Sequence, residues 1–110
     1  MAINKKSEFA PQDQLLADFA KVLSHPARIA ILKVLAQKGV CICGEIVEVL
    51  PLAQSTVSQH LKDMKAAGII TGEVEGTKSC YCIDWEVLKT GCDAVQAMAK
   101  ELVVAKKRCC

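Results

Sequence analysis

The stretch Ala53-Gln54-Ser55-Thr56-Val57-Ser58-Gln59-His60-Leu61-Lys62-Asp63-Met64 decides the fold. Its apolar residues Val57, Leu61 and Met64 recur at helical spacing, which predicts one buried helix face. The polar residues fall on the opposite face, where short side chains could reach the phosphates and base edges of DNA. A solvated helix face would give the same pattern, so the flanking segments have to decide. The candidate DNA-contacting residues are Gln54, Ser55, Thr56, Ser58, Gln59 and Lys62, of which Lys62 suits a phosphate.

The flanking segments complete a winged helix-turn-helix. Residues 45–50 are expected to form a short helix, Pro51-Leu52-Ala53 a tight turn and residues 54–67 a longer helix, so the helix-turn-helix spans 45–67. Residues 69–75 and 79–84 look like strands joined by Gly76-Thr77-Lys78, which predicts a β-wing over 69–84. A short strand at 40–43 is expected to pair with the second wing strand, as it commonly does in winged helices.

Two further helices are predicted to mediate dimerisation. Residues 12–23 carry Leu15, Leu16, Phe19, Val22 and Leu23 on one expected buried face, and residues 85–108 carry apolar residues at the spacing of a helix-helix seam. Another helix over 26–37 begins at a proline, and Asp84 is expected to cap the last helix. The prediction is one mainly α domain over 1–110, with about five helices and an antiparallel sheet of two to three strands.

The composition agrees with a small helical domain. The chain has 110 residues, 52% of them hydrophobic and only 4% aromatic, so Ala, Val, Ile and Leu must build the core. A net charge of +2 is too small to indicate nucleic-acid binding without a motif. The polar start and the lack of a long apolar run predict a cytoplasmic protein without a membrane partner.

Three stretches together resemble the ArsR/SmtB family of metal-responsive repressors: residues 25–32 (HPARIAIL), 54–61 (QSTVSQHL) and 66–70 (AAGII). The resemblance implies a homodimer that binds double-stranded operator DNA and is released by an inducer. It places Ser55, Thr56, Ser58, Gln59 and His60 on the recognition helix. It brings Lys78, on the wing, near the phosphate backbone.

Seven cysteines are far more than packing requires, and an odd number cannot all pair within one chain. In a reducing cytoplasm, clustered thiols indicate metal or redox chemistry more often than a disulfide scaffold. They are Cys41, Cys43, Cys80, Cys82, Cys92, Cys109 and Cys110.

The first predicted metal site joins two strands. Cys41-Ile42-Cys43 resembles the Cys-Val-Cys stretch of thiolate-binding family members, although Ile46 stands where arsenite-sensing relatives can have a third thiol. Cys80 and Cys82 alternate along the second wing strand and share a face, so we predict a cluster of Cys41 or Cys43 with Cys80 or Cys82. The alternative is that one cysteine of each pair is a small buried apolar residue.

Thiolates favour As(III), Sb(III) or another soft ion such as cadmium, lead or zinc, and the resemblance points first to trivalent arsenic as inducer. Cys109 and Cys110 form a second candidate site or a frayed tail, and Cys92 is expected in the dimer core. The family's zinc site on the last helix requires histidine, which residues 85–110 lack. No cofactor is required.

Three other functions compete with this prediction. A redox or persulfide sensor of the same fold would use the same cysteines. A thiol metal chaperone would leave the polar helix face without a role. An enzyme is not expected, because both histidines lie within the helix-turn-helix architecture. Of these, His25 is interpreted as a local hydrogen-bonding residue, and His60 as either packed or DNA-facing.

Overall fold

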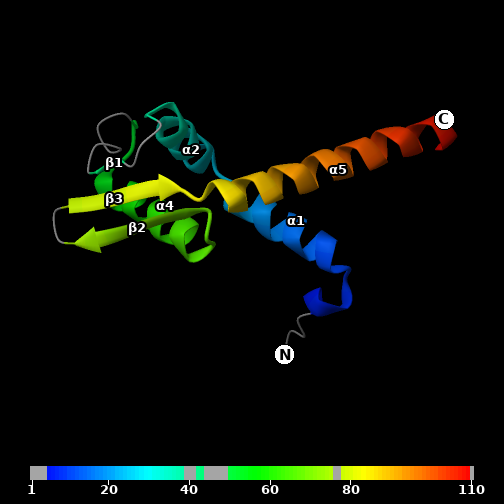
Figure 1. Ribbon diagram of the computed structural model, residues 1–110, viewed down its shortest axis with the longest axis horizontal. Helices are drawn as coiled ribbons and strands as arrows, with labels where there is room; N and C mark the ends of the chain where they lie inside the picture. The colour runs from blue at the N-terminus through cyan, green and yellow to red at the C-terminus, as the bar shows by residue number, and fades with distance from the viewer. Residues whose placement is uncertain (1–4, 39–41, 44–49, 76–77, 110) are drawn as a thin grey trace.

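The computed structural model describes residues 5–38, 42–43, 50–75 and 78–109, with side-chain positions for all of these except 42–43, 73–75, 78–79 and 107–109 (Figure 1). The elements are η1 (Lys6–Glu8), α1 (Pro11–Val22), α2 (Pro26–Lys38), β1 (Ile42–Cys43), α4 (Gln54–Ala66), β2 (Ile70–Glu75), β3 (Lys78–Ile83) and α5 (Trp85–Cys109). The mainly α winged helix-turn-helix is confirmed. The short helix expected at 45–50 lies almost wholly outside the described residues and stays a prediction.

Local hydrogen bonds explain where the helices begin and end. Before α2, the Nδ1 atom of His25 accepts the backbone N–H of Ala27 at 3.0 Å, which confirms the local role expected for His25. At the end of α4, Gly68 has φ +84°, and the backbone N–H groups of Gly68 and Ile69 reach back to carbonyls of the last turn. This termination favours glycine, because other side chains rarely adopt such a φ.

The sheet confirms the predicted pairing of the short first strand with the second wing strand. Its order is β1-β3-β2 and both pairs are antiparallel. Lys78 belongs to β3, so the strand begins one residue earlier than expected. In β2, Gly72 lies opposite Tyr81, and a Cβ atom there would stand 2.0 Å from the carbonyl oxygen of Cys80. The strands can approach this closely because Gly72 has no side chain.

One core joins α2, α4 and the sheet, and Phe19 of α1 reaches it. It is built mainly from aliphatic side chains, as the composition predicted, with one tyrosine and one phenylalanine. Its buried members are Phe19, Ile31, Leu32, Leu35, Val57, Leu61, Met64, Ile69, Ile70, Tyr81 and Ile83.

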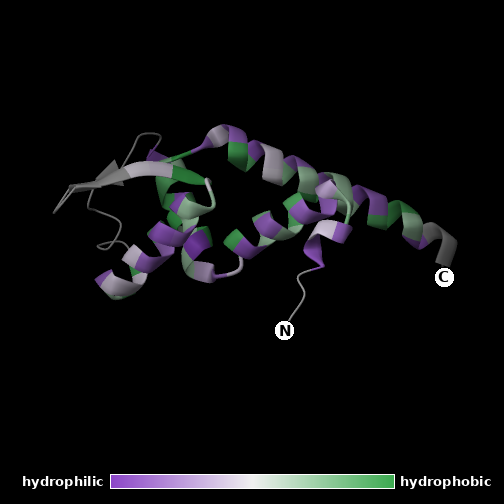
Figure 2. Ribbon diagram, turned by 90° about the horizontal axis from the view of Figure 1, so that it is seen from below, coloured by the Kyte–Doolittle hydropathy of each residue, from purple (hydrophilic) through white to green (hydrophobic). Residues whose placement is uncertain are grey.

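Helices α1 and α5 cross beside this body, and α5 continues well past it (Figures 1 and 2). They touch where Gly91 of α5 faces the ring of Phe19. Within the protomer, Phe19 is the only buried residue of α1, whereas Leu15 is 38% exposed. Leu16, Val22 and Leu23 are half-buried, and Val22 and Leu23 pack against the core. The predicted face is therefore partly covered within the described chain, and its role in dimerisation stays a prediction.

Candidate nucleic-acid interface and cysteine sites

Helix α4 has the two faces predicted from the sequence. Val57, Leu61 and Met64 are buried in the core. The polar residues predicted to face DNA remain accessible to different degrees. Gln54, Ser55, Thr56, Gln59 and Lys62 are exposed, whereas Ser58 and His60 are half-buried. The first turn of α4 contains no acidic residue, so the positive end of the helix dipole is not neutralised locally. This face is suited to an anionic partner.

The hairpin of β2 and β3 stands beside α4, and the two elements contact each other. Lys78 opens β3 at the end of the hairpin next to residues 76–77. Its backbone is described and its side chain is not, so its approach to phosphate stays a prediction.

Arg28 of α2 binds the inner side of α4 through two hydrogen bonds. Its Nη2 atom donates to Oδ2 of Asp63 at 2.8 Å, and its Nε atom donates to Nδ1 of His60 at 3.1 Å. The side chain of Arg28 is only 17% exposed, and its Nη1 atom also donates to the carbonyl oxygen of Val22 at 3.5 Å. Because this ion pair is partly shielded from water, it joins the two helices more firmly than a fully exposed pair would.

Asp63 connects this ion pair to the exposed face. Its second carboxylate oxygen, Oδ1, accepts a hydrogen bond from Nε2 of Gln59 at 3.0 Å. Gln59 and Asp63 are four residues apart on α4, the spacing at which side chains of one helix face meet. The amide of Gln59 is thus linked through Asp63 to Arg28.

His60 turns toward α2 and not outward with Gln59. Its ring lies 4.5 Å from that of His25, centroid to centroid. Burial lowers the pKa of His60 below its usual value, and electrostatic interaction with His25 and Arg28 adds to this effect, although Asp63 opposes it. A neutral imidazole also fits the hydrogen bond, because the Nδ1 atom that accepts from Arg28 must carry no proton.

Sequence reasoning singled out neither Arg28 nor Asp63. Arg28 gave a usable signal, because it lies three, four and seven residues before the core positions Ile31, Leu32 and Leu35. A charged residue on the apolar face of a helix needs a partner, and an acidic residue of a neighbouring helix is the natural one. Nothing in the sequence indicated that the partner would be Asp63.

The strand register brings two of the predicted metal-site positions together. Cys43 of β1 is the direct register partner of Cys80 of β3. Cys80 and Cys82 are half-buried, and each forms a disulfide bond. Cys41 lies outside the described residues, and the side chain of Cys43 is not described.

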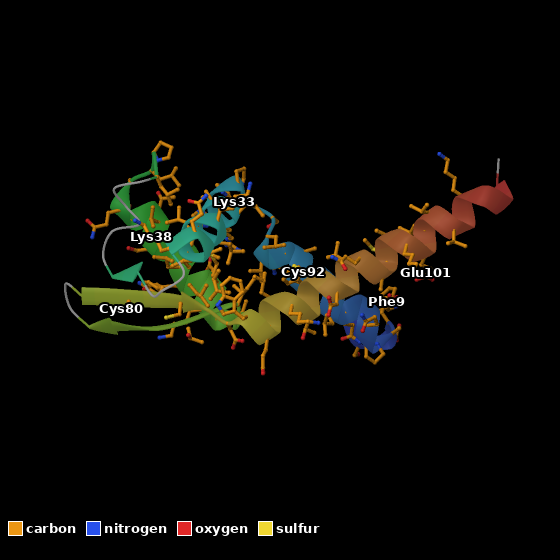
Figure 3. All side chains as sticks on the ribbon, turned by 45° about the horizontal axis from the view of Figure 1, so that its top comes forward. Phe9, Lys33, Lys38, Cys80, Cys92 and Glu101 are labelled. Atoms are coloured by element: carbon orange, nitrogen blue, oxygen red, sulfur yellow. The ribbon has the colours of Figure 1, made fainter. Side chains whose placement is uncertain are left out.

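The remaining cysteines lie on α5. Figure 3 shows Cys92 on this helix, well separated from Cys80 on the sheet. Cys92 is a free thiol and is exposed in the protomer. Cys109 ends α5 and its side chain is not described, and Cys110 lies beyond the described residues. Among the side chains that the structure does describe, no three or more His, Cys, Asp or Glu residues gather as metal ligands.

The apolar surface of α5 is large and has no partner within the described part of the protomer. Its exposed large apolar residues are Trp85, Val87, Val95, Met98, Leu102, Val103 and Val104. An open groove of about 1150 Å³ lies between α1, the end of α4 and the start of α5, and Leu15, Val22 and Val87 contribute to its lining. None of the described helices is both long and apolar enough to cross a membrane.

Residues 25–71 match the family model described as "Bacterial regulatory protein, arsR family". An uncharacterized HTH-type transcriptional regulator of Methanocaldococcus jannaschii is 41% identical over 68 residues, which cover 61% of this chain and 75% of the relative.

Two named repressors also match. The HTH-type transcriptional repressor SmtB of Mycobacterium tuberculosis is 41% identical over 76 residues, covering 66% of this chain and 56% of SmtB. The arsenical resistance operon repressor of Staphylococcus xylosus is 33% identical over 73 residues, covering 66% of this chain and 69% of the repressor. The chain thus matches little more than half the length of SmtB.

Solved structures agree on the fold. The crystal structure of an ArsR family transcriptional regulator superposes with a TM-score of 0.69 at 21% identity, covering 86% of this chain and 95% of that one. The homodimeric winged helix-turn-helix DNA-binding domain of a possible ArsR-family regulator from Mycobacterium bovis, solved by NMR, gives a TM-score of 0.56 at 26% identity. That match covers 97% of this chain and 90% of the other.

Proposed function

Because the chain belongs to the ArsR family of bacterial regulatory proteins, we propose that it is a homodimeric repressor that binds operator DNA through α4 and the wing. A soft metal or metalloid ion, in the first place trivalent arsenic, releases it from DNA by binding cysteine thiolates. Family membership also confirms that the chain is not an enzyme, because its relatives are DNA-binding transcriptional regulators.

One observation carries the DNA-binding part of the proposal: α4 buries Val57, Leu61 and Met64 while its polar face stays exposed beside the hairpin. Recognition helices need this division, because their inner face must hold the helix rigidly while their outer face enters the major groove. Ser, Thr and Gln side chains on that face can bond to phosphates and base edges, and Lys62 can neutralise a phosphate.

The exposed apolar residues of α5 support a homodimer. Val95, Met98 and Leu102 follow each other at three- and four-residue steps, and Leu102 is 60% exposed. Such a stripe on a helix that extends beyond the body favours a partner helix, and a second copy supplies one with the same stripe. The two copies of α4 in such a dimer would then bind two half-sites separated by about one or two turns of DNA.

The cysteines support a thiolate site for the inducer. The pairing of Cys43 with Cys80 joins the strand before the helix-turn-helix to the wing. Once the disulfide bonds of Cys80 and Cys82 are reduced to thiols, a soft ion bound there would alter the geometry between the wing and α4. Thiolate sulfur is the donor that such ions prefer. Cys41 and Cys82 would complete this set, and Cys109 with Cys110 is the second candidate. The ion's role would be to bring thiolates into a fixed arrangement.

A redox sensor is the second candidate function, and one observation favours it. Cys80 and Cys82 are in disulfide bonds in this structure. A thiol pair that is reduced during repression and oxidised to a disulfide by peroxide or polysulfide would change the same wing contacts without any metal.

DNA binding is tested first by titrating the protein onto its own upstream promoter DNA and onto scrambled DNA of equal length. Wild type is expected to prefer the promoter, and Gln59→Ala to lose most of that preference. Lys100→Ala, on the exposed surface of α5, is the control and should behave as wild type. Equal affinity of wild type for both DNAs would contradict the proposal. A thiol metal chaperone is expected to give this result, because it would have no preference for the promoter sequence.

The inducer is tested by adding arsenite, methylarsenite, cadmium or zinc to the protein–DNA complex under reducing conditions. Release by arsenite that is lost in Cys41→Ser or Cys82→Ser would support the strand site, and loss on deletion of Cys109 and Cys110 would support the tail site. Cys92→Ser is the matched control. If no ion releases DNA but a persulfide or peroxide does, the metalloid proposal fails and the redox function replaces it.

A further inference from the structure

We propose that Asp63 is a specificity-determining positioning residue, which holds the amide of Gln59 in the orientation that reads a base edge. Arg28 of α2 in turn fixes Asp63. This inference deepens the proposed function and rests on it, because it concerns how α4 distinguishes one DNA sequence from another.

The two oxygens of Asp63 have different partners. Oδ1 accepts from Nε2 of Gln59 at 3.0 Å, and Oδ2 accepts from Nη2 of Arg28 at 2.8 Å. The Asp63 side chain is 44% exposed, whereas the Arg28 side chain is 17% exposed. The restraint therefore comes from the inner side, where Arg28 is also bonded to His60 and to the carbonyl oxygen of Val22.

The chemistry of a carboxylate dictates which way the amide of Gln59 faces. A carboxylate can only accept hydrogen bonds, so the amide nitrogen must point toward Asp63 and the amide oxygen away from it. Without this bond, the terminal torsion of glutamine is broad and nearly two-fold, and both amide orientations are populated. Asp63 thus removes an ambiguity that an exposed glutamine would otherwise have.

The amide orientation held by Asp63 still has the groups needed to read DNA. One N–H bonds to Asp63, which leaves the second N–H and the oxygen Oε1 of Gln59. A donor beside an acceptor is the pair with which an amide binds the N7 and N6 atoms of adenine in the major groove. The expected ligand of Gln59 is therefore an adenine edge.

If Asp63 acted only through its negative charge, its removal would change DNA affinity in the opposite direction from the loss of a positioning residue. The direction of the change therefore tests the inference. A carboxylate close to the DNA-binding face repels phosphates, so its removal alone would tighten binding to every DNA sequence. Loss of a positioning residue instead weakens binding to the operator only.

The test is a double-mutant cycle on the full chain, with wild type, Asp63→Ala, Gln59→Ala and the double variant. Affinities for the upstream promoter fragment and for scrambled DNA are measured at one salt concentration. Asp63→Ala is expected to lower the promoter-to-scrambled affinity ratio roughly tenfold, about 1.4 kcal/mol, without weakening scrambled binding. In the Gln59→Ala background the same change should alter the ratio less than twofold.

Two further variants separate positioning from folding and charge. Asp93→Ala removes an exposed acid that pairs with Lys89 at 2.8 Å on α5, and should leave the ratio unchanged. Asp63→Asn keeps an acceptor oxygen and the side-chain size but loses the charge, so its ratio should fall between those of wild type and Asp63→Ala. Thermal melting of each variant confirms that it is folded at the assay temperature.

The outcomes distinguish the inference from the proposed function. If wild type prefers the promoter but Asp63→Ala changes both DNAs equally, or acts just as strongly when Gln59 is absent, the inference is wrong and the repressor function stands. If wild type itself shows no preference for the promoter, the proposed function fails and the inference fails with it.

Discussion

Replacing Gly91 by alanine tests the packing of α1 on α5, and its two energetic consequences oppose each other. Alanine is favoured over glycine within a helix by about 1 kcal/mol, which alone would stabilise α5. However, a Cβ atom at position 91 would stand 2.2 Å from Cδ1 and 2.5 Å from Cγ of Phe19.

The collision cannot be relieved by a small side-chain movement. The Cγ atom of Phe19 is close to the backbone of α1, and the residue is only 8% exposed. Either the two helices separate or the ring leaves its place in the core. Added atoms in a packed core typically cost about 1–3 kcal/mol. A collision this close belongs at the upper end, so the expected net loss of stability for Gly91→Ala is roughly 1–2 kcal/mol.

The assay is chemical unfolding at a fixed protein concentration, because the proposed dimerisation would make stability depend on concentration. Thr90→Ala, at the exposed neighbouring position, is the helix-propensity control and should be neutral or slightly stabilising. The double variant Gly91→Ala/Phe19→Leu should cost less than the sum of the single changes, since a smaller side chain removes the collision. A more stable Gly91→Ala protein would refute this reasoning.

Three other predictions follow from single contacts. Gly72→Ala should destabilise the wing by at least about 2 kcal/mol, because the new Cβ would collide with the carbonyl of Cys80 and the φ of residue 72 is +154°. Hydrogen exchange of the β2 and β3 amides would measure this loss, and unchanged protection of these amides would contradict the prediction. Asp84→Ala should lower stability by about 1 kcal/mol in thermal unfolding, because Oδ1 of Asp84 accepts a hydrogen bond from the backbone N–H of Val87 at 3.2 Å. Asp84→Asn should retain most of this stability, and an equal loss in the two variants would argue against capping. The pKa of His60 is lowered on folding, so the unfolded chain binds the proton more tightly than the folded chain. The free energy of unfolding should therefore fall as pH decreases from about 6.5 toward the pKa of His60 in the folded protein. An NMR titration midpoint for His60 at or above about 6.5 would contradict this prediction.

Most of the architecture was predictable because it depends on local patterns. The spacing of Val57, Leu61 and Met64 predicted the buried face of α4, and the glycine-bearing connection between two β-favouring runs predicted the wing. The capping role of Asp84 was also correct, since capping depends on a single short-range hydrogen bond. The structure moved helix and strand ends by only one or two residues.

The candidate site was predictable only in part. The accessible polar face of α4 follows from helical periodicity, and the pairing of the first strand with β3 followed from the general arrangement of winged helices. The sequence contained no information on the direction of His60, which turns toward Arg28 and accepts a hydrogen bond from it, whereas its neighbour Gln59 stays exposed. Which cysteines form the proposed metal site stays a prediction.

By itself, the sequence determined the fold class, because periodicity, capping and turn residues act over a few positions along the chain. The family was indicated by the resemblance of three short motifs. Only the tertiary structure decided that Arg28 and Asp63 meet 35 residues apart, that Gln59 is thereby held at the surface, and that Gly91 receives the ring of Phe19. These contacts depend on how α2 crosses α4 and how α1 crosses α5. Crossing geometry arises from the packing of the whole core, so no local pattern encodes it.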